Sequence, residues 1–531
     1  MNNMLEIKGL TIEKIIKKQV KERGEKIFIN YVTGQDTYTF REVHLISNQI
    51  ANNLISLGVT KGTHVASLMF NSPEQIFLYL ALGKIGAVSI PINTASRGAF
   101  LEYYVNQSDT TAIVVESSLL PILLEILPRT NISLVCVLGS CDELDIDLKQ
   151  EFVDFRSLMR GDDSDPVIEV SHSDLSAINY TSGTTGPSKG NVYTQAAALY
   201  FATNLMELLS ASERDTYYVC FPLFHAAAWN SAVLPMLQLG GTVALTRRFS
   251  AYNYIDEARK SHSTIFNLLS VGSFLLSQPP SPEDRNHRLR IGLAAPMPTN
   301  AEEFEKRFGV ILTGAFGLSD YACPFGLDPV DRARKRYSVG RPLKEIEVRL
   351  VDGDDFEVPT GVPGELVVRH KLPWVTPTGY YKMPDVTAES RKNLWFHTGD
   401  RMYRDEEGFY YFVDRKKDAI RRRGENISSF EVESAIAMHE GVAEVAVVGI
   451  RADTGEDDVA VAIVKAAAAD ICEKDIASFC ESRLPKYMWP RFVVFVDSLP
   501  KTLTEKIEKH KIRDMMRDKI GDLWDKEREM P

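Results

Sequence analysis

Hydrophobic and polar positions in residues 40–250 alternate between two periodicities. Residues 41–57 place apolar side chains three and four positions apart, which predicts an amphipathic helix, and residues 64–70 form a short apolar run that predicts a buried strand. The pair recurs as a helix-like segment at 74–86 and a strand-like run at 87–92. Further strand-like runs lie at residues 111–116 and 134–139. Alternation of this kind indicates parallel sheets covered by helices.

The pattern changes between about residue 340 and residue 415. Short alternating segments are separated here by glycine, proline and aspartate, and they lie at 345–352, 364–370 and 407–414. Such segments predict a small, mainly antiparallel sheet or a distorted β-barrel.

The last part of the chain, after the charged stretch at 414–423, has the pattern of a separate module. It contains two expected helices and three expected strands, in the order helix, strand, strand, helix, strand. The helices lie at 429–438 and 475–483, and the strands at 442–450, 458–466 and 491–497. The charged boundary at Asp414–Lys417 contains no long apolar run and suits a hinge.

These patterns together predict an α/β protein with two units. We expect residues 1–414 to form an N-terminal domain of parallel, helix-covered sheets plus a small distorted β-barrel. We expect residues 415–531 to form a small α+β domain, with a linker or hinge near residues 414–417.

The composition is that of an ordinary globular protein, with 44% of the 531 residues hydrophobic and 25% charged. This excludes a disordered, collagen-like or disulfide-scaffold protein. The net charge of −11 argues against a protein that coats DNA or RNA, which needs a broad positive field. It leaves room for a small anionic ligand held by a few focused groups.

Cysteine usage and the chain's beginning both favour a cytoplasmic enzyme. The N-terminal residues are charged and lack the apolar core of a secretory leader, and no apolar stretch reaches the roughly 18 residues of a membrane span. The six cysteines form no CxxC pair and are expected to be reduced thiols. They are Cys136, Cys141, Cys220, Cys323, Cys472 and Cys480.

The segment Tyr180–Gly190, with the sequence YTSGTTGPSKG, is the most informative in the chain. Its glycines let backbone amides approach an anion closely, its hydroxyls supply donors, and Lys189 supplies positive charge. This combination suits a polyphosphate, although Ser188 stands where a Walker A loop has its second glycine. The candidate phosphate-binding residues are Thr181, Ser182, Gly183, Thr184, Thr185, Gly186 and Lys189.

This loop closely resembles the phosphate loop of the adenylate-forming superfamily, which contains acyl-CoA synthetases, nonribosomal-peptide adenylation domains and beetle luciferases. The resemblance extends from about residue 15 to about residue 515, with further motifs in the family's order and spacing. These are FPLFHAAA (221–228), GLAAPM (292–297), TGAFGLSD (313–320), WFHTGD (395–400), FVDRKKDAIRRRGENIS (412–428) and LPKTLTEKIEK (499–509). The DRKKDAIRRRGENIS stretch is similar to that of crotonobetaine/carnitine-CoA ligases.

The resemblance implies roles for individual residues. Lys506 would reach the α-phosphate and the substrate carboxylate, and His225 would lie beside the carboxylate pocket. Asp400 would accept hydrogen bonds from the ribose, Asp320 would hold Mg²⁺, and Lys417 would be the hinge about which the small domain rotates. The other candidates for contact with ATP or CoA are Gly292, Ala294, Ala295, Pro296, Ala315, Phe316, Gly317, Ser319, Phe412, Arg415 and Gly424.

Three residues depart from the family's pattern. Asp320 replaces a glutamate and is one methylene shorter, and Ser319 replaces a threonine while keeping the hydroxyl. Glu505 stands where the family mostly has glycine, directly before Lys506. Its carboxylate could pair with that lysine or repel the triphosphate, which puts the rate of adenylation in question.

The resemblance implies an ATP-dependent carboxylate–CoA ligase that forms acyl-AMP with release of pyrophosphate and then transfers the acyl group to CoA with release of AMP. ATP, Mg²⁺ and CoA are the implied cofactors, with a carboxylic acid as substrate and neither nucleic acid nor a membrane span. Gly317, where acetate-specialised members have tryptophan, predicts an acid larger than acetate. Trp229 and Asn230 could line the acyl pocket or pack beneath it. The sequence leaves the oligomeric state open, with a homodimer as one arrangement.

Three other functions stay open from the sequence alone. The first is a freestanding acyl-adenylating enzyme that loads a carrier-protein thiol. The second is a luciferase-like oxidoreductase, and the third is a non-catalytic nucleotide sensor inactivated by Glu505.

Overall fold

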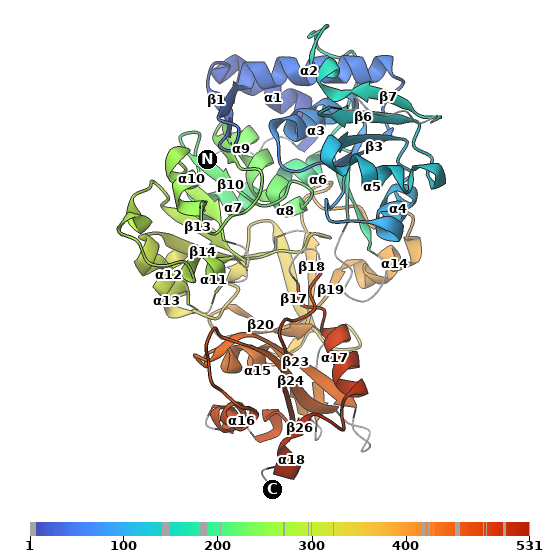
Figure 1. Cartoon of the computed structure of the whole chain (residues 1–531). Helices are drawn as coiled ribbons and strands as arrows, with labels where there is room; N and C mark the ends of the chain where they lie inside the picture. The colour runs from blue at the N-terminus through green and yellow to red at the C-terminus, as the bar shows by residue number, and fades with distance from the viewer. Residues whose placement is uncertain are drawn as a thin grey trace.

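The computed structural model describes residues 7–140, 149–180, 188–201, 203–268, 271–295, 297–298, 300–321, 323–415, 420–422, 425–427, 429–451, 457–481, 483–484, 486–502 and 506–529. The chain forms a large part that ends at residue 415 and a smaller part that begins at residue 420 and lies below it in Figure 1. None of the helices in these ranges combines the length and apolarity needed to cross a bilayer.

A seven-stranded sheet contains the first predicted strands. Its order is β7-β6-β5-β3-β4-β8-β9, and neighbouring strands are parallel except for the antiparallel pair β8 and β9. The strands are β3 (His64–Leu68), β4 (Val88–Pro91), β5 (Ala112–Glu116), β6 (Leu134–Leu138), β7 (Glu151–Asp154), β8 (Leu175–Tyr180) and β9 (Gly190–Thr194). The four apolar runs of residues 64–139 are therefore strands, as the pattern predicts.

A nine-stranded sheet lies beside it, in the order β16-β15-β14-β13-β12-β10-β11-β1-β2. Its strands are parallel from β14 to β1, and antiparallel strands flank this stretch at both edges. The strands are β1 (Ile27–Tyr31), β2 (Asp36–Thr39), β10 (Thr216–Val219), β11 (Thr242–Leu245), β12 (Ile265–Asn267), β13 (Ile291–Ala294), β14 (Ile311–Phe316), β15 (Phe325–Leu327) and β16 (Arg341–Pro342).

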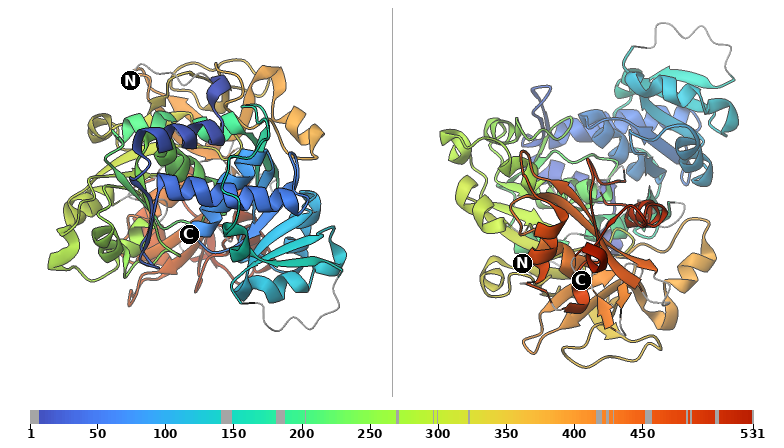
Figure 2. Two further views of the ribbon diagram at one scale, coloured as in Figure 1. Left: turned by 90° about the horizontal axis from the view of Figure 1, so that it is seen from above. Right: turned by 60° about the horizontal axis from the view of Figure 1, so that its bottom comes forward.

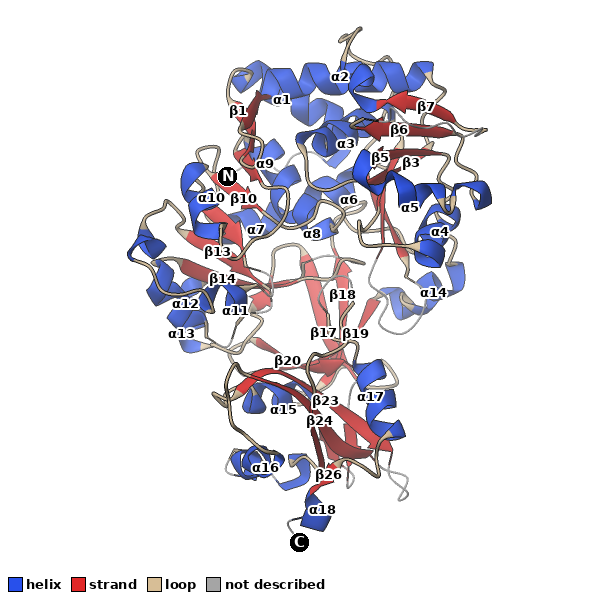
Figure 3. Cartoon of the chain, viewed as in Figure 1, coloured by secondary structure: helices blue, strands red, loops and turns tan. Residues whose placement is uncertain are grey.

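Helices cover these sheets, as Figure 3 shows. Helix α2 (Phe40–Ser56) begins with a capping box between Thr39 and Glu42, and α3 (Pro73–Ile85) is buried on every side. The largest apolar core contains residues of α3 and of both sheets, which is the position expected for a helix that is apolar all round. The other helices of the large part are α1 (Ile12–Arg23), α4 (Gly98–Gln107), α5 (Leu120–Leu124), α6 (Gln195–Tyr200), α7 (Thr203–Leu208), α8 (Ala226–Ala228), α9 (Leu234–Leu239), α10 (Tyr254–Lys260), α11 (Gly272–Leu276), α12 (Ala301–Phe308), α13 (Pro329–Arg334) and α14 (Pro384–Glu389).

A third sheet of four antiparallel strands matches the prediction for residues 340–415. Its strands are β17 (Ile346–Val351), β18 (Gly364–His370), β19 (Phe396–Arg404) and β20 (Tyr410–Arg415). The register shifts between Glu365 and Val367 and again between Arg401 and Met402, so the sheet is distorted.

The smaller part has its own sheet, in the order β23-β24-β25-β26, with an apolar cluster on each face. The strands of this sheet are β23 (Val442–Arg451), β24 (Asp457–Lys465), β25 (Phe492–Phe495) and β26 (Trp524–Asp525), and β21 (Ile420–Arg422) and β22 (Glu425–Ile427) form a separate antiparallel pair. The helices of the smaller part are α15 (Ser429–Ile436), α16 (Glu473–Glu481), α17 (Lys509–Asp518) and α18 (Lys526–Glu529). The two further views in Figure 2 show this part packed on one end of the larger one. The α/β fold predicted from the sequence, with a small α+β module after it, is thereby confirmed.

Five of the six cysteines fall within the described ranges, and all five are free thiols: Cys136, Cys220, Cys323, Cys472 and Cys480. Cys141 lies outside those ranges.

Candidate active site

A cavity of about 380 Å³ lies where the two large sheets meet the smaller part. Its walls include residues that follow the carboxyl ends of β4, β8, β10 and β14, together with residues from the smaller part. The carboxyl edge of parallel strands is the usual place for a ligand site in α/β folds. Asn93, Tyr180, His225, Ser319, Lys501 and Lys506 are among the lining residues.

His225 begins α8, and its ring reaches back to the backbone. Its Nδ1 accepts a hydrogen bond from the Ala227 amide at 3.1 Å, so the proton of the neutral ring sits on Nε2. Burial lowers the pKa of His225 to about 4, and the positive charge of Lys506 adds to this effect. The imidazole is therefore neutral at pH 7, and its Nε2 proton is available for donation to a ligand in the cavity.

Lys506 reaches the same cavity from the smaller part, on a short loop closed at its base. The Lys506 amide donates to Thr502 Oγ1 at 3.2 Å, and the Thr502 amide donates to the Lys506 carbonyl at 2.7 Å. An isolated bridge between Lys501 and Ile507 closes the loop further. The structure thus brings together the two catalytic candidates, although 280 residues separate them in the chain. Glu505 lies outside the described residues.

Asp320 lies in the turn after β14 and is held by a tyrosine from another segment. Tyr380 donates its hydroxyl to Asp320 Oδ2 at 2.8 Å, and Lys189 Nζ lies 4.8 Å from the centre of the Tyr380 ring. Burial, together with the carboxylate of Asp320, raises the pKa of Tyr380. Tyr380 could not be found from the sequence alone, because only the pairing of residues 378–381 with β9 brings it to this position.

Backbone hydrogen bonds hold residues 378–381 alongside β9. The Tyr381 amide donates to the Gly190 carbonyl at 2.8 Å, and the Val192 amide donates to the Gly379 carbonyl at 3.0 Å. Tyr103 and Tyr104 of α4 hold Ser188 from the other side, through its carbonyl at 2.9 Å and its hydroxyl at 3.1 Å. The hairpin of β8 and β9 that carries the phosphate-loop sequence is therefore tied to two neighbouring segments.

Asp400 lies within β19 and is 1% exposed. Its backbone is the register partner of Arg415 at the end of β20, so these two candidates for contact with ATP are neighbours across one ladder. Phe412, on the same strand as Arg415, lies 6.3 Å from Phe316 between ring centres. Two of the candidates for contact with ATP or CoA therefore meet.

The candidates in and after β13 and β14 lie partly in the core. Gly292 and Ala294 are buried inside β13, and a Cβ at position 292 would lie 2.3 Å from the ring of Phe266. The glycine is thus required by packing against Phe266. Ala315 and Phe316 end β14, and Gly317 and Ser319 follow it. A Cβ at Gly317 would lie 3.4 Å from Cys323 Sγ, which is an ordinary contact.

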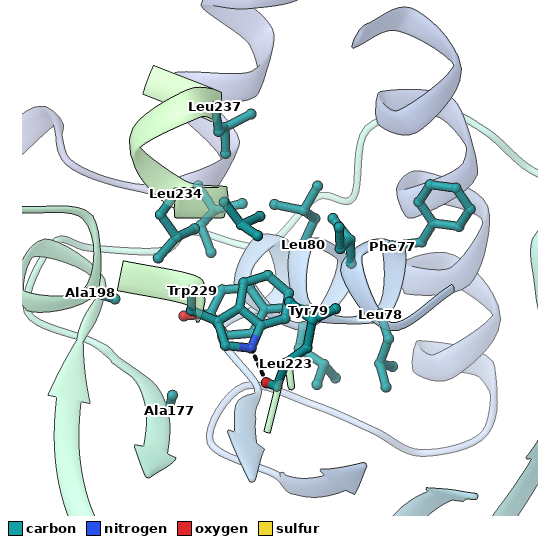
Figure 4. Close-up of a cluster of buried hydrophobic side chains, with 14 of the residues drawn as sticks. Phe77, Leu78, Tyr79, Leu80, Ala177, Ala198, Leu223, Trp229, Leu234 and Leu237 are labelled. Carbon is teal, nitrogen blue, oxygen red and sulfur yellow. Dashed lines mark hydrogen bonds between the residues drawn. The ribbon is translucent and has the colours of Figure 1, made fainter. Parts of the chain in front are cut away.

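Trp229 packs beneath the site and does not line it. Its ring stacks on Tyr79 with 4.1 Å between ring centres, and its Nε1 donates to the Leu223 carbonyl at 2.5 Å (Figure 4). Asn230 is also buried, at 1% exposed. The sequence left open whether Trp229 lines the acyl pocket or packs beneath it, and the structure shows that it packs beneath it.

Several predicted site residues lie outside the described ranges. They are Thr181, Ser182, Gly183, Thr184, Thr185, Gly186, Pro296, Lys417 and Gly424. Ala295 directly follows β13 and is partly buried. For Arg415, the structure describes the backbone only.

Comparisons with known proteins identify the family of this chain. The profile of AMP-binding enzymes matches residues 16–381, and that of the AMP-binding enzyme C-terminal domain matches residues 431–506. The chain is 31% identical to a crotonobetaine/carnitine–CoA ligase of Proteus mirabilis over 89% of its own length and 92% of that protein. It is 29% identical to the ligase of the same name from Salmonella arizonae, over 90% of this chain and 93% of that protein.

Among solved structures, ATP-bound MatB from Rhodopseudomonas palustris superposes with a TM-score of 0.85 at 25% identity, over 96% of this chain and 99% of that one. The match spans both the large and the small part, as do the two sequence profiles. The chain therefore belongs to the family of AMP-binding enzymes, among its adenylate-forming acyl-CoA ligases.

Proposed function

We propose that this chain joins a carboxylic acid larger than acetate to CoA in two steps, through an acyl-AMP intermediate. The proposal rests on one observation. His225 and Lys506 line the same cavity, beside the hairpin of β8 and β9. The cavity provides a neutral donor and a cation at one place, which suits a carboxylate that has to approach a phosphate.

In the first step, a carboxylate oxygen attacks the α-phosphorus of ATP. A C–O–P bond forms, the bond to the β-phosphate oxygen breaks, and pyrophosphate leaves with the electron pair. Negative charge gathers around phosphorus in this step, so fixed cations accelerate it more than a protein nucleophile would. Lys506 stabilises this negative charge, and neutral His225 donates a hydrogen bond to the substrate carboxylate.

In the second step, the thiol of CoA attacks the acyl carbonyl and AMP leaves. We propose that residues 415–531 rotate about Lys417 between the steps, which withdraws Lys506 and presents the face that carries Gly424. The separate apolar clusters of the smaller part support its movement as a unit.

Mg²⁺ fits the residues at this site. It is commonly held by one or two carboxylates, with phosphate oxygens and waters completing its shell. Asp320 offers such a carboxylate on the turn after β14, and Tyr380 fixes its orientation from the other side. A bound Mg²⁺ would neutralise charge on the phosphates of ATP.

The substrate class follows from Gly317 and from the relatives. Glycine at this position lacks the bulk that a tryptophan would bring, and a Cβ built there would lie 3.4 Å from Cys323 Sγ. The relatives named crotonobetaine/carnitine–CoA ligases make crotonobetaine and carnitine the first acids to test.

The experiment is to measure AMP and pyrophosphate release from ATP and Mg²⁺ with a panel of carboxylic acids, each with and without CoA. We expect one acid other than acetate to give release that rises sharply when CoA is added. Release that does not respond to CoA would contradict the choice of acceptor, and acetate as the best acid would contradict the size argument. If no acid gives release, the same panel with Glu505→Gly tests whether Glu505 inhibits the site.

A further inference from the structure

The loop that connects β10 to α8 carries His225 and forms one wall of the cavity. Phe224 and His225, at the end of this loop, are both lining residues. The His225 amide donates to the Pro222 carbonyl at 3.0 Å, so the position of the imidazole follows the path of the backbone just before it. The contacts that hold Leu223 and its neighbours therefore place the histidine.

A buried asparagine from the seven-stranded sheet reaches this loop of the nine-stranded sheet. Asn71 is 2% exposed and lies in the connection between β3 and α3. Its Nδ2 donates to the Phe221 carbonyl at 2.9 Å and to the Thr246 carbonyl at 3.0 Å, and its Oδ1 accepts from the Leu223 amide at 2.7 Å. One side chain thus ties together the segments that follow β3, β10 and β11, across the two sheets.

Leu223 is held at both its amide and its carbonyl. Asn71 holds the amide, and Trp229 Nε1 donates to the carbonyl at 2.5 Å (Figure 4). The Trp229 ring stacks on Tyr79 of α3, and α3 begins at Pro73, close behind Asn71. Both anchors of the histidine loop therefore depend on one segment of the chain, which is α3 and the connection before it.

The three contacts of Asn71 require a carboxamide. Its two N–H groups serve two carbonyls while its oxygen accepts from an amide, whereas an ionised carboxylate of the same shape has no proton to donate. Leu223 and Thr246 are both 0% exposed, so bulk water does not replace these hydrogen bonds. A buried backbone group without a partner costs free energy, and without Asn71 the loop would move to recover its hydrogen bonds.

We propose that Asn71 is a positioning residue for adenylation, which holds the loop after β10 so that His225 points its Nε2 proton at the substrate carboxylate. The proposal rests on the proposed function, which gives His225 that hydrogen bond. Asn71 is not among the described residues that line the cavity, so it acts through His225 and not by contact with a ligand. A misplacement of about 1 Å in a group that orients the substrate can lower the rate about 100-fold.

The first test locates His225 by NMR, without any substrate. The protein is labelled with ¹⁵N-histidine, and the ring signals of His225 are identified by their absence in His225→Ala. At pH 7 we expect the wild type to show the Nε2–H tautomer, because Nδ1 accepts from the Ala227 amide. In Asn71→Ala we expect shifted signals or the other tautomer. Unchanged His225 signals in Asn71→Ala overturn the proposal, whatever the activity.

The second test is a double-mutant cycle on adenylation. The kcat/KM for the best acid is measured by pyrophosphate release in the wild type, Asn71→Ala, His225→Ala and the double variant. We expect Asn71→Ala to lower it about ten- to hundredfold when His225 is present and less than about twofold when His225 is already replaced, because an effect that passes through the histidine is not lost twice. The Kd for ATP should stay unchanged. Losses that multiply in the double variant would show that Asn71 acts elsewhere.

Asn53→Ala is the matched control for a general loss of stability. Asn53 Nδ2 also donates to three carbonyls, at 3.0, 3.0 and 2.9 Å, but it lies on α2 and is not a lining residue of the cavity. This variant should lower the midpoint of urea unfolding and leave kcat/KM for the acid unchanged. A loss of kcat/KM equal to that of Asn71→Ala would attribute the effect to stability and overturn the proposal.

Two further outcomes are covered. If Asn71→Ala does not fold, Asn71→Ser, whose hydroxyl keeps part of the polar contact, takes its place in both tests with the same expected results. Failure of the proposed function shows differently: no acid gives pyrophosphate release, or His225→Ala leaves kcat/KM unchanged. The NMR signals of His225 still decide in that case whether Asn71 positions the ring.

Discussion

Removal of the Lys506 side chain should separate the two half-reactions. Lys506 shares the cavity with His225 and lies close enough for its charge to lower the pKa of that histidine. In Lys506→Ala, we expect adenylation to be abolished while transfer to CoA from preformed acyl-AMP proceeds at the wild-type rate. The two rates are measured separately, by pyrophosphate release and by thioester formation. Equal loss in both half-reactions would contradict a role confined to the first step.

Asp400 should matter for nucleotide affinity. Its carboxylate is buried in β19, beside the end of β20. Asp400→Ala should weaken ATP binding by about 1.5–3 kcal/mol, as expected when hydrogen bonds to a charged group are lost. Calorimetric titration with ATP measures this, and Asp400→Asn, which keeps the shape, is the matched variant with a smaller expected loss. Unchanged affinity in a folded Asp400→Ala protein would remove this residue from the site.

We expect Tyr380 to position the carboxylate of Asp320, so its loss should raise the Mg²⁺ concentration that the enzyme needs. Its hydroxyl fixes one oxygen of Asp320, so Tyr380→Phe frees the carboxylate to rotate. We expect the Mg²⁺ concentration for half-maximal adenylation to rise about three- to tenfold, which corresponds to the net contribution of about one ordinary hydrogen bond. ATP binding without metal should stay unchanged. Tyr381→Phe is the control, because the Tyr381 hydroxyl donates to Asp109 instead, at 2.9 Å. Equal shifts in the two variants would count against the Asp320 contact as the cause.

Secondary structure elements were largely predictable because their patterns are local. The runs at 64–70 and 134–139 show as strands β3 and β6, and the spacing at 41–57 shows as α2. Contacts that depend on distant segments were not predictable. Tyr380 reaches Asp320 only because its segment pairs with β9, and a glycine in the motif at 292–297 proved to serve packing against Phe266. Local sequence can name a residue type for a site but cannot show which distant side chain it meets.

The packing of α2 on α3 contains a buried charge with a testable pH dependence. Lys84 of α3 is 1% exposed, and its Nζ donates to the His44 carbonyl at 3.0 Å and to Asn48 Oδ1 at 2.6 Å, both from α2. Burial lowers the pKa of Lys84 to about 7, against 10.5 for the ordinary side chain. Between these two values the unfolded chain binds more protons at this residue than the folded one, so stability rises with pH.

Lys84→Met should remove that dependence. From pH 7 to pH 9, the free energy of unfolding of the wild type should rise, relative to Lys84→Met, by up to about 1.4 kcal/mol per pH unit. Urea unfolding at several pH values measures the difference, and the exposed Lys18 of α1, changed to Met, is the control that should track the wild type. A constant difference between wild type and Lys84→Met across this range would show that Lys84 does not titrate there.

At the scale of the whole molecule, the question is what holds the smaller part in the position where Lys506 faces His225. Among the ring pairs of the described residues, one joins the two parts: Phe430, at the start of α15, meets Phe412 of β20 edge to face at 5.4 Å. Phe412 in turn lies beside Phe316 at the end of β14, so the contact connects the smaller part to two of the residues predicted to contact ATP or CoA. An aromatic pair of this kind contributes about 0.5–1.5 kcal/mol.

Phe430→Ala should therefore shift the enzyme away from the orientation suited to adenylation. We expect the adenylation rate to fall about two- to tenfold, which corresponds to that energy, while thioester formation from preformed acyl-AMP is unchanged or faster. Phe274 of the large part is 45% exposed, close to the 44% of Phe430, so Phe274→Ala is a control of matched size and exposure. Slower thioester formation in Phe430→Ala would mean that the contact serves both orientations, whereas unchanged rates in both steps would mean that the position of the smaller part is set elsewhere.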